Sequence, residues 1–357
     1  MKITEIKLPF KLKNAVLALG SQTKNTVCFA KGDKAWVSLT HKDLSAPKDL
    51  SDFEKDAEHF LKENPKIIAY DLHPEYQSTR FALSLSPQYR LMPVQHHHAH
   101  ITSCMAENGL KNQQVIGVAF DGTGLGVDNA VWGAEFLLCD YNKFSRAAHL
   151  KEIPLVGGER AILEPIRLAC AWLDFDQSID KRQIFKKIFL SGINSPLASS
   201  MGRLFDAAAS LVLGKRKASF EAELAIELEK LAAENNLKTL DYKFKIIKSK
   251  NGYILDPSGI FKRIVRDLKA KNHPGNIARS FHQSVADMIV STCLLLKKEN
   301  RINKVVLSGG VFQNKLLLKM SFDALCKEGF KVFTHKYLSC NDSGISLGQA
   351  VIAGYRS

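Results

Sequence analysis

The chain has 357 residues, of which 45% are hydrophobic and 24% are charged, as is ordinary for a soluble globular protein of two domains. Its apolar runs are too short to span a membrane, it has no signal-peptide core, and its seven cysteines form no C-x-x-C pair. These features argue against a membrane protein, a disulfide framework and a zinc ribbon, and they favour the cytoplasm. The net charge of +14 calls for an anionic partner. Because the lysines are dispersed, a nucleotide-using enzyme or an acidic protein partner explains the charge as well as nucleic acid does.

The first part of the chain predicts alternating strands and helices. Apolar segments favour strands at residues 15–19, 26–30, 35–39, 67–71 and 91–95, and helices are expected over residues 51–63 and 76–85. Ser51 and Glu54 form a capping box at the start of the first helix. The loop at residues 20–25 carries Lys24, and its polar groups suit a phosphate, although most such loops are only turns.

Four of the 11 histidines stand within five residues, at His96, His97, His98 and His100. The following residues predict a helix that ends at Gly109. Residues four apart lie on one face of a helix, so His96 and His100 can present two imidazoles to one point. Such a pair predicts a transition-metal site that needs one or two further ligands, often carboxylates. The alternative is a solvated helix start or an adventitious metal site.

A glycine-rich loop is predicted after the apolar strand at residues 115–120. It begins with Asp121, and Gly122, Thr123 and Gly124 follow. A carboxylate at the carboxyl end of a buried strand stands where α/β sheets bind ligands. Asp121 is therefore placed to join the two histidines, unless the segment is only a hairpin loop with an Asx turn. The strand–loop–strand units at residues 15–39 and 115–138 suggest a duplicated nucleotide-binding lobe.

The second part of the chain predicts mostly helix over residues 158–235, a peripheral hairpin over 238–257 and a long helix over 277–298. A strand at residues 304–307 precedes Gly309 and Gly310, a pattern that suits adenosine or phosphate at a helix N-terminus. Asp342 stands at the start of the last helix. It is either an N-cap only or a fourth metal ligand from the second lobe.

These motifs resemble, in the same order, the C-terminal transferase portion of the HypF family of hydrogenase maturation carbamoyltransferases. That portion is itself similar to the tRNA threonylcarbamoyl transferases. The resemblance covers nearly the whole chain. The matching segments are residues 20–29, 94–100, 120–136, 157–167, 200–206, 220–221, 308–314 and 341–350.

The resemblance implies an α/β protein with the two-lobed fold of actin, sugar kinases and Hsp70, and a nucleotide cleft between the lobes. We expect an N-terminal lobe over residues 1–155, and a C-terminal lobe with a helical insertion over residues 156–357. The resemblance implies one divalent transition metal, iron or zinc, held by His96, His100, Asp121 and Asp342. It also implies carbamoyl-adenylate as the nucleotide, with Lys24 and Asp121 as catalytic residues. The implied nucleotide-binding residues are Lys24, Gly122, Thr123, Gly124, Gly202, Asp206, Glu221, Gly309, Gly310 and Asn314.

Two partners follow from the same resemblance. Full-length members of the family carry upstream an acylphosphatase-like domain, a zinc-finger segment and a YrdC-like domain that makes the adenylate. We expect a separate YrdC-like protein to supply the adenylate here. The acceptor in the family is the C-terminal cysteine of a HypE-like maturation protein. The family's usual Asn-Asp-Gly-Gly motif has serine at its third position here, Ser343.

Three other functions stay open at this point. A small-molecule O-carbamoyltransferase would share the fold and chemistry, but those enzymes also carry a YrdC-like domain. The charge favours a tRNA threonylcarbamoyl transferase, but those enzymes typically have His-x-x-Gly-His and Gly-Gly-Val-Ala-Ala-Asn motifs. This chain departs from them at Ala99, Phe312 and Gln313. The last alternative is a catalytically idle nucleotide-binding module. Activity with supplied carbamoyl-adenylate would separate it from the others.

Overall fold

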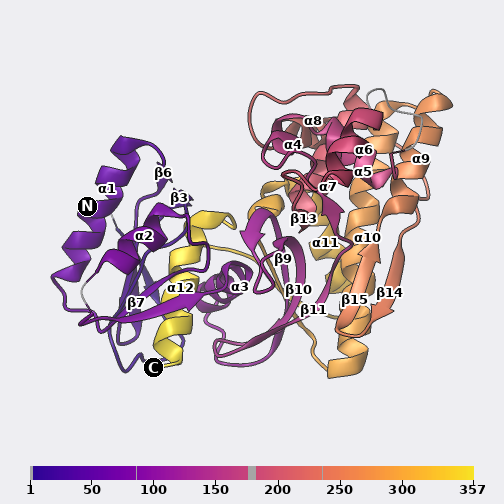
Figure 1. Cartoon of the computed structure of the whole chain (residues 1–357). Coiled ribbons are helices and arrows are strands. Elements are labelled where there is room, and N and C mark those ends of the chain that lie inside the picture. Colours follow the sequence, from indigo (N-terminus) through magenta and orange to yellow (C-terminus); the bar gives the residue numbers. More distant parts are fainter. Residues whose placement is uncertain (1–2, 86, 176–181, 235) are drawn as a thin grey trace.

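The computed structural model describes residues 3–85, 87–175, 182–234 and 236–357, and it has two lobes, each built around a sheet (Figure 1). The first lobe contains a six-stranded sheet in the order β1-β5-β4-β2-β7-β8. Its strands are β1 (Ile3–Lys7), β2 (Val16–Ala18), β4 (Cys28–Lys31), β5 (Lys34–Ser38), β7 (Ile67–Asp71) and β8 (Arg90–Val94). The strands β3 (Thr23–Asn25) and β6 (His41–Asp43) pair beside it.

Alternate residues of β2 face different helices, as a sheet buried on both sides requires. Leu17 packs with the residues of α1 (Pro47–Leu61) and α2 (Gln77–Ser84), whereas Val16 and Ala18 share a core with α12 (Ile345–Tyr355). The helix α1 begins before the predicted capping box. Ala46 is its N-cap without a side-chain hydrogen bond, and Pro47 is its first residue. The prediction of Ser51 as the cap was therefore wrong, because proline at the first position starts the helix instead.

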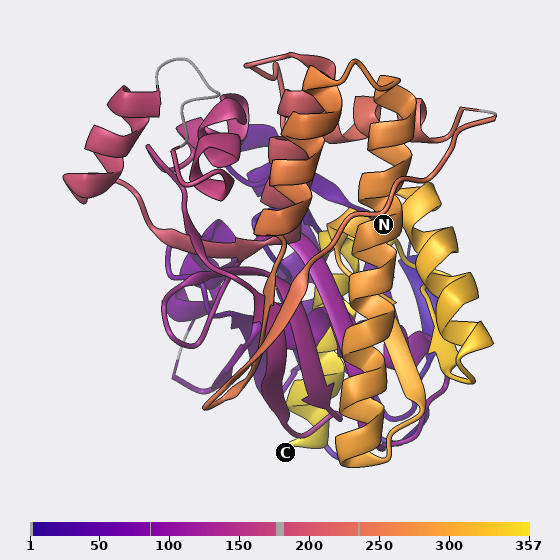
Figure 2. The same ribbon diagram turned by 90° about the vertical axis from the view of Figure 1, so that its right-hand side faces the viewer.

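The second lobe contains a nine-stranded sheet whose main path is β14-β15-β11-β10-β9-β16-β17. Helices α7 (Met201–Leu213) and α10 (Pro274–Asn300) pack on one face of β9 (Val115–Leu125). The helix α3 (His96–Glu107) packs on β9 and β16 (Lys304–Ser308). Figure 2 shows the long α10, in orange, running along the outer side of the lobe. Its strands are β9 (Val115–Leu125), β10 (Val131–Cys139), β11 (Phe144–Leu150), β12 (Ile153–Pro154), β13 (Leu197–Ser200), β14 (Lys245–Ser249), β15 (Gly252–Asp256), β16 (Lys304–Ser308) and β17 (Lys331–Phe333).

The predicted helical regions at residues 158–235 and 277–298 do contain helices, but β13 lies within the first region and the helix at residues 258–269 was not predicted. The helix α8 begins at Glu223, so Phe220 and Glu221 lie just before it. The helices are α4 (Arg160–Leu163), α5 (Ile166–Trp172), α6 (Arg182–Leu190), α7 (Met201–Leu213), α8 (Glu223–Ala232), α9 (Ser258–Lys269), α10 (Pro274–Asn300) and α11 (Lys315–Lys327), with 3-10 turns η1 (Gly310–Gln313) and η2 (Asp342–Gly344).

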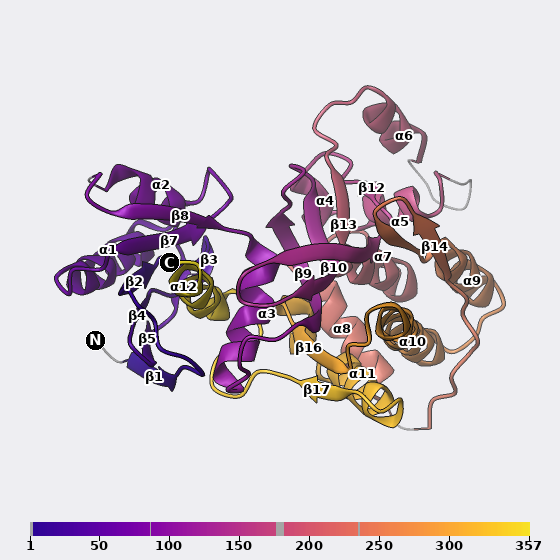
Figure 3. The ribbon, with the colours of Figure 1, turned by 90° about the horizontal axis from the view of Figure 1, so that it is seen from below.

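Two helices lie between the sheets, α3 (His96–Glu107) and α12 (Figure 3). The helix α12 packs on β2, β4 and β7 of the first sheet, α3 packs on β9 and β16 of the second, and the two helices contact each other. Gly348 makes this contact close, because a Cβ there would lie 1.9 Å from the Ala99 carbonyl oxygen. The backbone of α3 beside His96 and His100 is therefore held directly against the last helix of the chain.

The sheets do not follow a division of the chain at residue 155. Strands β9, β10 and β11 lie before that residue, yet they form the centre of the second sheet beside β16. The helix α12 lies near the C-terminus, yet it covers the first sheet. The predicted domain boundary at residue 155 stays a prediction, and it does not coincide with the division between the two sheets.

Candidate metal centre and adjoining cavity

The start of α3 places the histidines. Gln95 is the N-cap, and its side-chain oxygen accepts a hydrogen bond from the backbone N–H of His98. His96 and His100 then lie one turn apart, with ring centroids 5.0 Å from each other, and both are fully buried. His98 faces away, and its Nε2 lies 2.7 Å from the Asp140 carbonyl oxygen. The predicted pairing of His96 with His100 on one helix face is confirmed.

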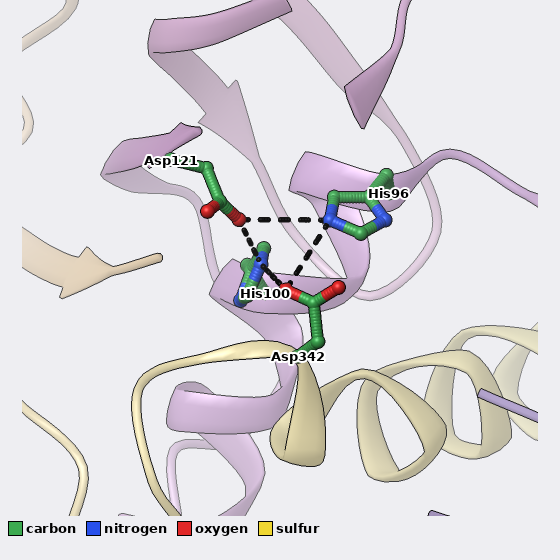
Figure 4. A group of neighbouring side chains, drawn as sticks. All are labelled: His96, His100, Asp121 and Asp342. Carbon is green, nitrogen blue, oxygen red and sulfur yellow. Dashed lines mark hydrogen bonds and ion pairs between the residues drawn. The ribbon is translucent and has the colours of Figure 1, made fainter. Parts of the chain in front are cut away.

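Two aspartates from distant segments complete a cluster with these histidines (Figure 4). The Oδ2 atom of Asp121 lies 2.7 Å from His100 Nε2 and 3.6 Å from His96 Nε2. The Oδ1 atom of Asp342 lies 3.7 Å from His100 Nε2 and 3.8 Å from His96 Nε2. The four predicted ligand side chains therefore converge, from α3, from β9 and from the turn η2.

The prediction that a loop begins at Asp121 was wrong. The strand β9 continues to Leu125, and its Gly124 pairs with Trp132 of β10. A bulge in β10 between Trp132 and Ala134 accompanies this extension. Asp121 thus lies between two paired stretches of β9, residues 115–120 and 124–125. The pairing also places Gly124 against His96 and His97, where a Cβ would lie 2.6 Å from His97 Cε1.

A third carboxylate, which the sequence reasoning missed, contacts the ring nitrogen of His96 that faces away from Asp121 and Asp342. The Oδ2 atom of Asp71 lies 2.8 Å from His96 Nδ1, and both side chains are fully buried. Asp71 is the last residue of β7, and a carboxylate at the end of a buried strand was the signal that singled out Asp121. A carboxylate on the outer nitrogen of a histidine fixes its ring and leaves the inner nitrogen free for a metal.

The aspartates and histidines of the cluster shift one another's pKa values in opposite directions. Burial alone would lower the pKa of His96, but Asp71, Asp121 and Asp342 outweigh burial and raise it well above its usual value. The same balance, with Asp121 and Asp342 as the carboxylates, raises the pKa of His100. Burial would raise the pKa of Asp121, but the two histidines outweigh it and hold that pKa well below its usual range. A cation at the centre would take the place of the histidine protons that these carboxylates attract.

The donor set fits a divalent transition metal. His96 Nε2 is buried and, within the described part of the chain, has no hydrogen-bond partner. Leaving a buried ring nitrogen unpaired costs free energy, and this nitrogen faces the two aspartates (Figure 4). Two imidazoles with two carboxylates suit iron and zinc alike.

A cavity of about 700 Å³ adjoins the centre, and Asp121 belongs to both. Eight of the predicted nucleotide-binding or catalytic residues line it: Lys24, Asp121, Gly122, Gly202, Asp206, Glu221, Gly310 and Asn314. Three predicted residues are outside its lining. Thr123 is exposed, Gly124 packs on the histidines, and Gly309 lies against the Phe120 carbonyl oxygen with a φ of +105°.

Two cationic residues of the cavity, Arg203 and Lys42, were missed by the sequence reasoning. Arg203 is buried, and its guanidinium lies 2.8 Å from an oxygen of Asp206 and 3.1 Å from one of Glu221. The carboxylate of Asp206 is therefore engaged by arginine at the cavity wall. Lys42 adds a second ammonium group beside Lys24, from the strand that pairs with β3. A lone lysine carried no recognisable pattern in the sequence.

Comparison with known proteins decides the family. The profile "HypF Kae1-like domain" matches residues 11–107, and "Carbamoyltransferase, Kae1-like Domain, second subdomain" matches residues 117–349. A protein of Cupriavidus necator described as "Carbamoyltransferase HypF homolog" is 33% identical, and the match covers 95% of this chain and 91% of that protein. The chain belongs to the HypF carbamoyltransferase family.

Other HypF proteins are longer. "Carbamoyltransferase HypF2" of Cupriavidus necator is 33% identical over 96% of this chain but only 47% of its own length. The chain thus spans about half the length of several relatives that it matches. The crystal structure of "full-length HypF in the phosphate- and nucleotide-bound form" is 41% identical and superposes with a TM-score of 0.91, covering 99% of this chain and 57% of that one. The predicted two-lobed actin-like fold is confirmed.

Among the residues that the structure describes, no helix is both long enough and apolar enough to cross a bilayer.

Proposed function

We propose that this chain transfers a carbamoyl group from carbamoyl-adenylate to an acceptor thiolate. One observation carries the proposal: Asp121 is shared by the histidine–aspartate centre and by the cavity. A ligand that fills the cavity would therefore present its reactive end at the centre. Membership of a carbamoyltransferase family supports the carbamoyl group as the one transferred.

The cavity suits an adenylate in size and charge. Its volume of about 700 Å³ lies within the range of roughly 300–1,000 Å³ that small-molecule sites occupy. Lys24 and Lys42 offer positive charge to a phosphate, and Gly122, Gly202 and Gly310 let the backbone approach a ligand closely. A HypF relative whose structure is described as phosphate- and nucleotide-bound supports the same class of ligand.

In this proposal His96, His100, Asp121 and Asp342 hold one divalent metal, iron or zinc. When bound, the metal would supply Lewis-acid polarisation of an oxygen atom of the substrate. The protein's own part is to fix the two imidazoles, to exclude water from their buried faces and to place Asp121 at the cavity wall.

The transfer is a substitution at the carbamoyl carbon. A bond forms from the acceptor sulfur to this carbon, the carbon–oxygen bond to the phosphate breaks, and AMP leaves with the electron pair. Lys24 and Lys42 would stabilise the negative charge on the departing phosphate. A thiolate is nucleophilic near neutral pH, so the reaction needs no dedicated base from the protein.

Two partners belong to the proposal. A YrdC-like protein or domain supplies the adenylate, and a HypE-like maturation protein offers its C-terminal cysteine as the acceptor. Both partners are what the resemblance to the HypF family implies. The positive charge of the chain suits an acidic docking partner.

The acceptor can be tested with two peptides. The chain is supplied with carbamoyl-adenylate and with a peptide that ends in cysteine, and a matched peptide ending in serine is the control. We expect one carbamoyl group to be added to the cysteine peptide, as measured by mass spectrometry. Equal carbamoylation of the serine peptide would contradict a thiolate acceptor and point to hydroxyl transfer instead.

A further inference from the structure

A continuous row of polar side chains runs from His100 away from the metal centre. The Oγ atom of Ser308 lies 3.4 Å from His100 Nδ1 and 2.8 Å from His335 Nε2. The other ring nitrogen of His335, Nδ1, lies 2.5 Å from an oxygen of Glu107. Four side chains from three parts of the sequence therefore connect the centre to a carboxylate at the far end of α3.

The row is enclosed by the protein. Ser308 and His100 are fully buried, and the side chains of His335 and Glu107 are 5% and 0% exposed. Ser308 ends β16, and His335 stands in the segment after β17. Buried polar groups of this kind are expected to be fully hydrogen-bonded, and their orientation is costly to change.

Glu107 is anchored from a second direction. Its two oxygens accept hydrogen bonds from the backbone N–H groups of Lys336, Tyr337 and Leu338, at 2.9–3.1 Å. Burial would raise the pKa of Glu107, but His335 and these N–H groups outweigh it and lower that pKa below its usual value. The carboxylate is therefore a fixed acceptor, and it defines the direction of the whole row.

The direction of the protons follows from that acceptor. The Glu107 carboxylate beside His335 Nδ1 favours the proton on Nδ1, and Nε2 can then accept a hydrogen bond from the Ser308 hydroxyl. The Ser308 oxygen then has a lone pair for the N–H at His100 Nδ1. With its proton on Nδ1, His100 presents a lone pair on Nε2, the atom that faces Asp121 and Asp342.

We propose that Ser308, His335 and Glu107 are positioning residues that hold His100 in the tautomer and ring orientation required for binding a metal. The proposal rests on the metal centre of the proposed function and adds to it the residues that set one ligand. Asp71 contacts His96 Nδ1 directly and so orients that ring, whereas the Glu107 carboxylate orients His100 through His335 and Ser308. Partners of this kind typically change metal affinity by roughly 10–100-fold when they are removed.

The same carboxylate and imidazole lie close to Cys104, so the three side chains form a second group with the spacing of metal ligands. One observation favours positioning over a second metal, because Glu107 already accepts three backbone hydrogen bonds.

The test compares two serine-to-alanine substitutions. Ser308→Ala removes the bridging hydroxyl, and Ser284→Ala is the matched control, a buried serine of α10 whose hydroxyl donates to the Ser280 carbonyl oxygen. Zinc affinity is measured by competition with a chelator, and the visible spectrum of the cobalt(II)-loaded protein is recorded at saturation. We expect Ser308→Ala to weaken zinc binding about 10-fold or more and to shift the cobalt bands. Ser284→Ala should change neither.

A second pair of substitutions guards against general disruption. His335→Phe keeps a ring of similar size without nitrogens and should reproduce the loss, whereas His335→Gln retains a polar side chain and should recover part of the affinity. Unchanged affinity and spectrum in Ser308→Ala, or two zinc ions per wild-type chain with one lost in Cys104→Ala, would overturn the proposal. These readouts require no carbamoyl transfer. A failure of transfer with normal metal affinities would therefore count against the proposed function alone.

Discussion

The Nδ1 atoms of His96 and His100 contact different side chains, Asp71 and Ser308. The substitution that tests each histidine therefore has to be chosen separately. His96 is held by Asp71, which is buried and charged, so a variant must keep a donor for that carboxylate. Glutamine does so through its amide. His98, two residues further on, is also buried, but its ring nitrogen lies against a backbone carbonyl.

His96→Gln should lose at least about 100-fold in metal affinity, because an amide is a weak ligand for a transition metal. The free energy of unfolding of the metal-free protein should change by only about 1 kcal/mol, since the hydrogen bond to Asp71 is kept. Elemental analysis and denaturant titration measure the two quantities. The control, His98→Gln, should retain the metal. If both variants bind metal as the wild type does, the centre is assigned to the wrong face of α3.

The sequence predicted the four residues that converge at the centre but not the side chains that hydrogen-bond to them. His96 and His100 follow from helix spacing, and Asp121 follows from its place after a buried strand. Ser308, His335 and Arg203 carry no local pattern, and Asp71 ends a buried strand as the signal for Asp121 requires but was not connected with the centre. They matter because segments far apart in the chain meet in space, and such meetings depend on tertiary packing that a single sequence does not display. The nucleotide-binding role of Gly309 stays a prediction, and the structure places this residue against Phe120, outside the lining of the cavity.

At the scale of elements, the two ends of α3 have different roles. Its first two turns carry His96 and His100, and its last residue, Glu107, accepts hydrogen bonds from the backbone N–H groups of residues 336–338. The charge on Glu107 should therefore contribute to stability in a pH-dependent way.

Glu107→Gln should lower the free energy of unfolding by about 2 kcal/mol at pH 7, because hydrogen bonds to a buried charge are lost. The pKa of Glu107 in the folded protein lies below its usual value of 4.5. Its contribution is thus complete above that value and is lost as the pH falls through the lowered pKa. Wild type and variant should converge in acid, as measured by denaturant titration in the presence of a chelator. The exposed Glu58→Gln is the control for removing one charge. A difference that persists undiminished at low pH would show that packing, and not charge, is responsible.

The helix α8 forms one wall of the cavity, and Ala225 on this helix lines it. Ala225→Trp should fill part of the space and weaken AMP binding by about 10-fold or more, as isothermal titration calorimetry would show. Metal content should stay normal, since Ala225 is not among the four converging ligands. Ala233→Trp, at the exposed end of the same helix, is the control. Equal AMP affinity in both variants would place the nucleotide elsewhere.

The boundaries of helices and strands could be predicted where the local sequence determines them. They could not be predicted where pairing with a distant strand determines them. The hairpin at residues 245–256 and the long α10 follow from their patterns. The extension of β9 through its glycines does not, because glycine disfavours strands and only the pairing with β10 keeps the segment extended.

At the scale of the whole molecule, the centre is made by contact between the lobes. His96 and His100 lie on the helix that packs on the second sheet, and Asp342 precedes the helix that packs on the first. Gly20 and Gln349 add a pair of hydrogen bonds between the first lobe and α12. Any movement of the lobes that separates α3 from α12 would therefore also change the distances among the metal ligands.

The central claim is that carbamoyl transfer depends on this one centre. The direct measurement is the rate of carbamoylation of a cysteine-ended acceptor, with carbamoyl-adenylate supplied, as the metal-free chain is titrated with zinc or iron(II). We predict that the rate rises in proportion to bound metal and reaches its maximum at one ion per chain. His96→Gln should show no such rise. A full rate in the metal-free chain, or a maximum that His96→Gln also reaches, would contradict the account.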